Sequence, residues 1–250
     1  MADLKLGKRP ATVIQGLKYA DAYSVGAPLT PPSEFSVPRP NGGFPILGND
    51  VCGDCTIAGA AHAIAAVEAD IPFSQQTRFT TEEVVGQYSA ITGYDPQTGA
   101  NDTGCNENQV LELWRTHGLF NGHKILAHAP IPPHDILAVH RAIAYYGVCY
   151  IGIACPASAQ QEFRAGAPWI VAPNSPIIGG HCIVAVGYDP AYIECATWGG
   201  VAYVSWPFWE TYCDEAHVLI TGAEVRAKRG TGTHPLDLDG LIADLDRLAA

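Results

Sequence analysis

The sequence predicts an α+β protein with a helical first half and an antiparallel, strand-rich second half. Helix-like apolar periodicity dominates before residue 120, whereas short strand-like segments dominate after residue 147. Such segregation favours α+β over an alternating arrangement with a parallel sheet. The 250 residues are enough for one large domain or two lobes with a substantial core.

The first 48 residues are interrupted by prolines between positions 28 and 45, so we predict an extended arm that runs over the surface. Helices are expected at about 56–70, 80–92 and 106–117. The second of these begins with a capping pattern, Thr80 followed by Glu83. A glycine-rich loop precedes the third helix.

In the second half, residues 148–153 read as a strand and 157–164 as a short helix. Further strands are expected at 181–188, 192–196, 200–204 and 216–219. A charged tail then ends in leucines at helical spacing. This pattern predicts a short helix that packs against the rest of the same chain, with a dimer contact as the less simple alternative. The predicted organisation is an arm (1–48), a helical lobe (about 49–145), a β lobe (about 146–222) and a tail (223–250).

Composition excludes several classes of function. A hydrophobic fraction of 48% and a charged fraction of 16% are typical of a globular chain. The net charge of −11 disfavours a nucleic-acid partner, and no apolar run is long enough to suggest a membrane partner. The first ten residues lack the apolar core of a secretory signal, so we expect synthesis in the cytosol. Oligomeric state is left open.

The most informative stretch is the bent loop that ends at Cys55 and is followed by an alanine-rich helix. A thiol at a helix N-terminus ionises more readily, because free amide N–H groups and the helix dipole favour negative charge. The alternative is a small buried cysteine at the start of a core helix. The Cys52-x-x-Cys55 pair lacks two further ligands at zinc spacing, so we expect no metal and no cofactor.

A nucleophilic thiol requires a histidine base. His62 lies two helical turns from Cys55, roughly 10 Å along the axis, and is expected to be a packed histidine. His181 opens the most apolar strand and follows two glycines, which makes it the candidate base. The remaining histidines are expected to be solvated: His117, His123, His128, His134, His140, His217 and His234.

Over roughly residues 45–222 the sequence resembles papain-like cysteine peptidases, which have two lobes. The resemblance rests on Cys52-Gly53-Asp54-Cys55, Gly104-Cys105-Asn106, Tyr146-Gly147-Val148 through Phe163, Gly180–Tyr188 and Thr197-Trp198-Gly199. It implies Cys55 as nucleophile, His181 as base and acid, and a Cys52–Cys105 disulfide. Asn49 corresponds to the oxyanion-hole amide, and Trp198 and Gly180 are implied to contact substrate.

Three features depart from the family. Asn49 is one methylene shorter than the family's Gln. Ala196 or Thr197 stands where the family has the Asn that orients the histidine, and a Thr hydroxyl could accept from the imidazole. Neither a secretory signal nor a recognisable inhibitory propeptide precedes the body. This pattern is also similar to phage- and prophage-encoded papain-like proteins, which adds virion-associated or released protein to the expected locations.

The sequence therefore favours a hydrolase that cleaves peptide or amide bonds in peptide or protein substrates through a Cys55 thioester. Asp54, beside the nucleophile, is expected to face solvent, because an inward carboxylate would raise the thiol pKa. A catalytically weak binding module with the same fold is one alternative. An amidase that acts on cell-wall peptides is another.

Overall fold

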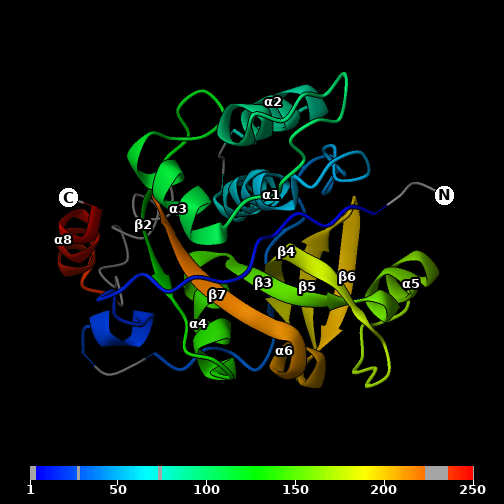
Figure 1. Ribbon diagram of the computed structural model, residues 1–250. Helices are drawn as coiled ribbons and strands as arrows, with labels where there is room; N and C mark the ends of the chain where they lie inside the picture. Colours follow the sequence, from blue (N-terminus) through cyan, green and yellow to red (C-terminus); the bar gives the residue numbers. More distant parts are fainter. Residues whose placement is uncertain (1–3, 27–28, 73–74, 223–235, 250) are drawn as a thin grey trace.

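The computed structural model describes residues 4–26, 29–72, 75–222 and 236–249 (Figure 1). Its helices are η1 (Ala20–Tyr23), α1 (Cys55–Asp70), α2 (Thr81–Thr92), α3 (Glu107–Thr116), α4 (Ile136–Tyr146), α5 (Ala157–Ala165), α6 (Trp206–Tyr212) and α8 (Leu238–Ala249). Its strands are β1 (Phe35–Ser36), β2 (Ile125–Pro130), β3 (Cys149–Pro156), β4 (Ile177–Tyr188), β5 (Tyr192–Thr197), β6 (Gly200–Ser205) and β7 (Cys213–Thr221). The predicted α+β class is confirmed. Within these ranges, no helix is both long enough and apolar enough to cross a bilayer.

One antiparallel sheet joins the strands in the order β2-β7-β3-β4-β5-β6, and β1 pairs with β4. β4 is central, so its residues from His181 to Tyr188 are buried on both faces. Ile183 and Ala185 point into one core cluster, whereas Cys182 and Val184 point into the other. This alternation follows from the two-residue period of a strand.

Helices cover both faces of the sheet. In Figure 1, α1, α2 and α3 lie on one side of it, and α4 and α6 lie on the other. α1 is buried on nearly its whole circumference, since its alanines allow close packing against β4. Neither β2 nor α4 was predicted. Both come from the stretch assigned to the helical lobe, yet they pack with the sheet and the core cluster that contains Ile183 and Ala185.

Local signals set the helix boundaries. Thr80 and Glu83 form the predicted capping box at α2, and the Asn106 side chain accepts from the Gln109 N–H at α3. In the tail, α8 buries Leu241 and Leu245 in the core cluster that contains Ile183 and Ala185. The predicted packing of this helix against the rest of its own chain is confirmed. The tail residues 223–235 lie outside the described residues.

The N-terminal arm differs from the prediction. Its first described segment, Leu4–Arg9, does not run over the surface but lies between the loop before α3 and the start of β4. Lys8 is bridged to Cys105 on one side and to Gly180 on the other, and is only 5% exposed. Because this segment has free main-chain groups on both edges, it can pair with both walls like an added strand.

Candidate active site

Cys55 is the first residue of α1 and is 2% exposed. Its sulfur accepts a hydrogen bond from the Cys182 N–H at 3.4 Å, which fixes it against the middle of β4. As the first residue of the helix, Cys55 contributes one of the N–H groups that have no partner within the helix. A negative charge on its sulfur or on a neighbouring oxygen would therefore be stabilised.

His181 lies in β4, next to Cys182, and is also buried. Its Nε2 lies 2.7 Å from Thr197 Oγ1 at the end of β5. Trp198 stacks on the imidazole with ring centroids 4.2 Å apart and planes 16° apart. Among the described residues the other ring nitrogen, Nδ1, is buried and has no hydrogen-bond partner. The hydroxyl and the indole thus fix the ring and leave Nδ1 available.

The fold brings the sequence-predicted residues together around one small cavity. Its lining includes Asn49, Cys55, His181, Thr197 and Trp198. The free space is about 10 Å³, enough for about one water molecule. Gly180 lies beside this group and contacts the arm. Sulfur, imidazole and hydroxyl therefore share one site, and little room is left for a substrate.

The segment Leu4–Arg9 fills the space next to this cavity. The Lys5 N–H donates to Asn49 O at 2.8 Å, and the Trp198 indole donates to Lys5 O at 3.1 Å. Further along, the Cys105 N–H donates to Gly7 O at 2.8 Å and the Lys8 N–H donates to Gly180 O at 3.1 Å. The arm therefore crosses the site as an extended peptide held through its main chain by both walls.

Glycines make this close approach possible. A Cβ at Gly7 would lie 1.7 Å from Gly53 O, and one at Gly104 would lie 2.0 Å from Gly7 O. A Cβ at Gly180 would lie 2.3 Å from Lys8 O. These contacts involve backbone atoms, which cannot swing aside as a flexible side chain can, so the arm and both walls must be glycine at these points.

Burial controls the charge of the site. It raises the pKa of Cys55 to about 12, although the Cys182 and Gly7 N–H groups oppose this by stabilising the thiolate. Burial also lowers the pKa of His181 to about 3, with a smaller contribution from His62. At neutral pH the covered site therefore holds a neutral thiol and a neutral imidazole. The ionised thiol expected from the position of Cys55 at a helix N-terminus is not the favoured state here.

Asp54 was expected to face solvent, and this was wrong. The residue is fully buried. Burial raises its pKa to about 8, and the nearby Asn49 amide and Cys52 thiol only partly offset this. A carboxyl with such a pKa is mostly protonated at neutral pH, and a neutral acid can be buried where a carboxylate could not.

Asn49 is turned toward its own loop. Its Nδ2 donates to Cys52 O at 3.3 Å, and its amide also lies beside the Asp54 carboxyl. The shorter side chain therefore ties together the loop before Cys55 while it lines the cavity.

The Cys52–Cys105 disulfide implied by the resemblance is not formed, since both residues are free, buried thiols. The two sulfurs face different groups. Cys52 Sγ lies 3.8 Å from Gly48 O, whereas Cys105 interacts with the Thr56 side chain.

Two histidines expected to be solvated, His128 and His217, are buried. His62 is packed as predicted, with Nε2 2.8 Å from Pro45 O. Sequence reasoning missed the role of Gly7 and Lys8 in covering the site. The glycines at 104, 179 and 180, on either side of the site, were the available signal, because glycine often marks a close approach of another backbone.

The structure has helices on both faces of an antiparallel sheet, with a cysteine at the start of α1 beside a histidine on β4, and this is the papain-like cysteine-protease fold. β4 begins at Ile177, four residues before the predicted strand start at His181. Solved structures with this fold match most of the chain. No family model matches it, and the curated protein sequences contain no match either.

Xylellain, a cysteine protease from Xylella fastidiosa, is 14% identical, and the match covers 88% of this chain and 98% of xylellain with a TM-score of 0.59. The cysteine protease and lectin-like domains of Cwp84, a surface-layer-associated protein of Clostridium difficile, are 10% identical over 88% of this chain and 56% of Cwp84, with a TM-score of 0.57. The proform of Amb a 11, a ragweed pollen cysteine protease, is 14% identical over 88% and 69%, with a TM-score of 0.54. Identities this low establish the fold alone. The likeness to phage proteins stays a prediction.

Proposed function

We propose that this chain is a cysteine hydrolase that cleaves peptide or amide bonds at Cys55. The observation that carries the proposal is the extended segment Leu4–Arg9, which is held by main-chain hydrogen bonds across the sulfur. A cleft that binds one extended peptide through its backbone fits other peptides in the same way. The cysteine proteases that share the fold support a peptide or protein substrate.

In the proposed reaction, the arm leaves, substrate enters, and Cys55 transfers its thiol proton to His181 Nδ1. The thiolate attacks the carbonyl carbon, and the Cys55 N–H stabilises the oxyanion, joined by the Asn49 amide once it turns from Cys52 O into the cavity. His181 returns the proton to the leaving amine, which breaks the C–N bond and leaves a thioester. Water, deprotonated by His181, then hydrolyses the thioester and regenerates the thiol.

Thr197 and Trp198 act through the histidine. The Thr197 hydroxyl can accept from the Nε2–H of the imidazole, which would leave Nδ1 unprotonated and able to take the thiol proton. Trp198 restricts the ring to one plane and limits water on that face. A hydroxyl replaces the family's amide here, and a single neutral hydrogen bond can still orient the ring.

The test is hydrolysis of casein by a variant whose arm cannot lie in the cleft, Gly7→Ala, with and without Cys55→Ala. We expect cleavage by Gly7→Ala and none by the double variant. Gly86→Ala in α2 is the matched control, since a Cβ there meets nothing within 4 Å. Cleavage that persists without the Cys55 thiol would contradict the proposal. Purified peptidoglycan as a parallel substrate separates a peptidase from a cell-wall amidase.

A binding module without hydrolysis is the second candidate, favoured by the raised pKa of Cys55 beneath the arm. It predicts that Gly7→Ala binds an extended peptide but releases no product. Equal peptide binding by Gly7→Ala and by the double variant with Cys55→Ala, with no turnover in either, would favour this reading over the hydrolase.

A further inference from the structure

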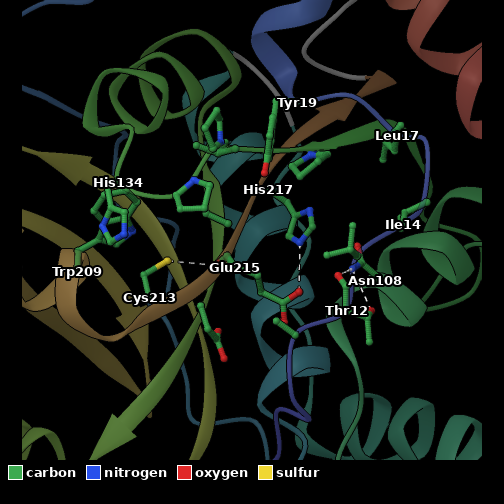
Figure 2. A pocket seen from close by; sticks show the side chains of 18 residues that line it. Thr12, Ile14, Leu17, Tyr19, Asn108, His134, Trp209, Cys213, Glu215 and His217 are labelled. Atoms are coloured by element: carbon green, nitrogen blue, oxygen red, sulfur yellow. Dashed lines mark hydrogen bonds and ion pairs between the residues drawn. The ribbon is translucent and has the colours of Figure 1, made fainter.

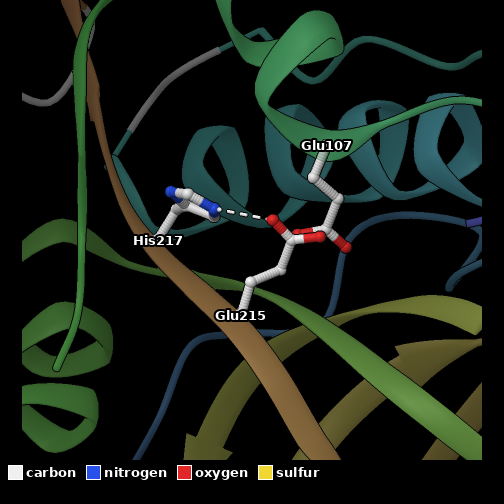
Figure 3. Close-up of side chains that lie close together, drawn as sticks. All are labelled: Glu107, Glu215 and His217. Atoms are coloured by element: carbon white, nitrogen blue, oxygen red, sulfur yellow. Dashed lines mark hydrogen bonds and ion pairs between the residues drawn. The ribbon is translucent and has the colours of Figure 1, made fainter. Parts of the chain in front are cut away.

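A second group of chemically reactive side chains lies between α3 and β7. It adjoins the Cys55 cavity, because Glu107 contacts the thiol of Cys182, which lines that cavity. Glu107 begins α3 and is fully buried, and Glu215 and His217 are two positions apart on β7. The two-residue period of the strand places both β7 side chains on the face toward α3. Figure 3 shows the two carboxyl groups close together and the imidazole pointing at Glu215.

The three residues are close enough to share one ion. Each offers one ligand atom, and these atoms all lie within 4.8 Å of one another. Glu215 Oε2 and His217 Nε2 are 3.5 Å apart. Two ligands at about 2.1 Å from one ion with a tetrahedral angle would be about 3.4 Å apart, so this pair is already at metal spacing. Glu107 needs only a modest side-chain movement to complete the set.

The cluster contains more carboxyl groups than positively charged groups. The Lys8 ammonium lies 3.0 Å from Glu215 Oε1 and 2.8 Å from Asp214 Oδ2, and its side chain is fully buried. One ammonium therefore faces three carboxyl groups. Apart from the thiol of Cys182, a weak donor, the Glu107 oxygens have no hydrogen-bond partner among the described residues. Burial, and then the charge of Glu215, raise the Glu107 pKa, and Lys8 only partly opposes this.

A cavity of about 290 Å³ reaches this cluster (Figure 2). Glu215 and His217 line it together with Asn108, whose Oδ1 is buried and has no partner among the described residues. The cavity is large enough for several water molecules. It therefore gives an ion both a path to the cluster and room for the waters that complete its coordination.

We propose that Glu107, Glu215 and His217 form a binding site for a divalent metal ion, which replaces the Lys8 ammonium at the Glu215 carboxylate. Two carboxylates and one imidazole suit Mn²⁺ or Zn²⁺, and two carboxylates balance the charge of the ion. A buried ammonium and a buried divalent cation on the same carboxylate repel each other strongly, so the two occupants exclude one another.

The site thereby controls the arm. Lys8 anchors the segment that covers Cys55, so an ion that displaces its ammonium weakens the cover. This regulatory consequence depends on the proposed hydrolase function, whereas metal binding itself does not. The sequence predicted no metal site, because Glu107 is more than 100 positions away in the chain from Glu215 and His217.

The experiment measures Mn²⁺ binding by calorimetry to the full chain after treatment with a chelator. Mn²⁺ is the probe because its preference for oxygen and imidazole ligands keeps it off the chain's eight cysteines. We expect Lys8→Met to bind one Mn²⁺ per chain roughly 10-fold or more tightly than the unaltered protein. In the Lys8→Met background, Glu107→Gln should weaken binding by roughly 10-fold or more. Glu82→Gln, on the exposed start of α2, should not.

Thermal unfolding distinguishes a loss of Mn²⁺ binding from a loss of folding in the Glu107→Gln variant. Glu107→Gln removes a buried carboxyl with no strong partner, so the metal-free variant should unfold at the same temperature as the parent or higher. Mn²⁺ should raise the unfolding temperature of Lys8→Met but not of its Glu107→Gln derivative. No saturable binding to Lys8→Met, or equal affinity after Glu107→Gln, would overturn the site and leave the cluster as an anchor for Lys8.

The link to the arm has a separate readout. Mn²⁺ at saturating concentration should accelerate iodoacetamide alkylation of Cys55 in the unaltered protein, and should not do so in Glu107→Gln. Tight binding without acceleration would refute the link while the site stands. Acceleration without casein cleavage would instead count against the proposed hydrolase.

Discussion

Gly7→Ala gives the sharpest test of how the arm controls Cys55. A Cβ at this position would lie 1.7 Å from Gly53 O and 2.2 Å from Gly53 C, well inside van der Waals contact. Both atoms belong to the backbone of the nucleophile loop, so the wall cannot yield cheaply. We expect the variant to release the segment around Gly7 from the cleft and to leave the rest of the fold intact.

Two independent routes give the size of the effect. Four main-chain hydrogen bonds hold the segment, made by the N–H groups of Lys5, Lys8, Arg9 and Cys105. At about 1 kcal/mol each, their loss shifts the equilibrium between covered and open site by about 1000-fold. The pKa of Cys55 gives an upper limit of the same size. A complete return from about 12 to the ordinary value of 9.0 on exposure would raise the thiolate fraction at neutral pH by about 1000-fold.

The assay is the rate of iodoacetamide labelling at Cys55, followed by peptide mapping so that the other seven cysteines are counted separately. Gly7→Ala should label roughly 100- to 1000-fold faster than the unaltered protein, and the midpoint of its rate against pH should fall. Gly86→Ala should label at the unaltered rate. If folded Gly7→Ala labelled no faster than this control, burial by the arm would not set the reactivity of Cys55, and the reasoning would fail.

Two further predictions concern single side chains. In the Gly7→Ala background, Thr197→Val should lower kcat about 10-fold with little change in KM, because it removes one hydrogen bond to His181 and keeps the side-chain shape. Thr197→Ser keeps the hydroxyl and should restore kcat. An equal loss of kcat in both variants would exclude a hydroxyl that orients His181. The pKa of Asp54 is higher in the folded protein than in the unfolded chain, so this carboxyl favours folding at low pH. As pH rises from about 4 to about 8, its contribution to the free energy of unfolding falls by about 1.4 kcal/mol per pH unit. Asp54→Asn should remove that part of the pH dependence in urea unfolding between pH 5 and 7.5, and identical slopes for variant and parent would show that the carboxyl is not buried in protonated form.

Local sequence signals predicted much of the helical part of the fold. Thr80 and Glu83 mark the start of α2 because their hydrogen bonds involve residues only three positions apart. The alanine-rich run after Cys55 predicted α1, and the apolar run after Gly180 predicted β4. β2 and α4 were missed, since their stability depends on packing against β7 and the sheet rather than on a strong local pattern.

Local pattern was a poor guide to burial of polar groups. Asp54, His128 and His217 read as solvated, because burial of a polar group depends on which distant segments pack over it. The pKa values of Cys55 and His181 were misjudged for the same reason. The helix end and the two side chains were identified from sequence, but the arm that excludes water from them was not.

The sequence by itself determined the α+β class, the helix start at Cys55, the strand that carries His181 and the capping of α2, because each depends on residues a few positions apart. Only the tertiary structure decided that Gly7 and Lys8 lie between the two walls of the site and that Glu107 meets Glu215 and His217. These contacts join segments that share no local periodicity. They arise from the sheet order and from the glycines that let one backbone approach another, and the charge state of Cys55 and His181 follows from them.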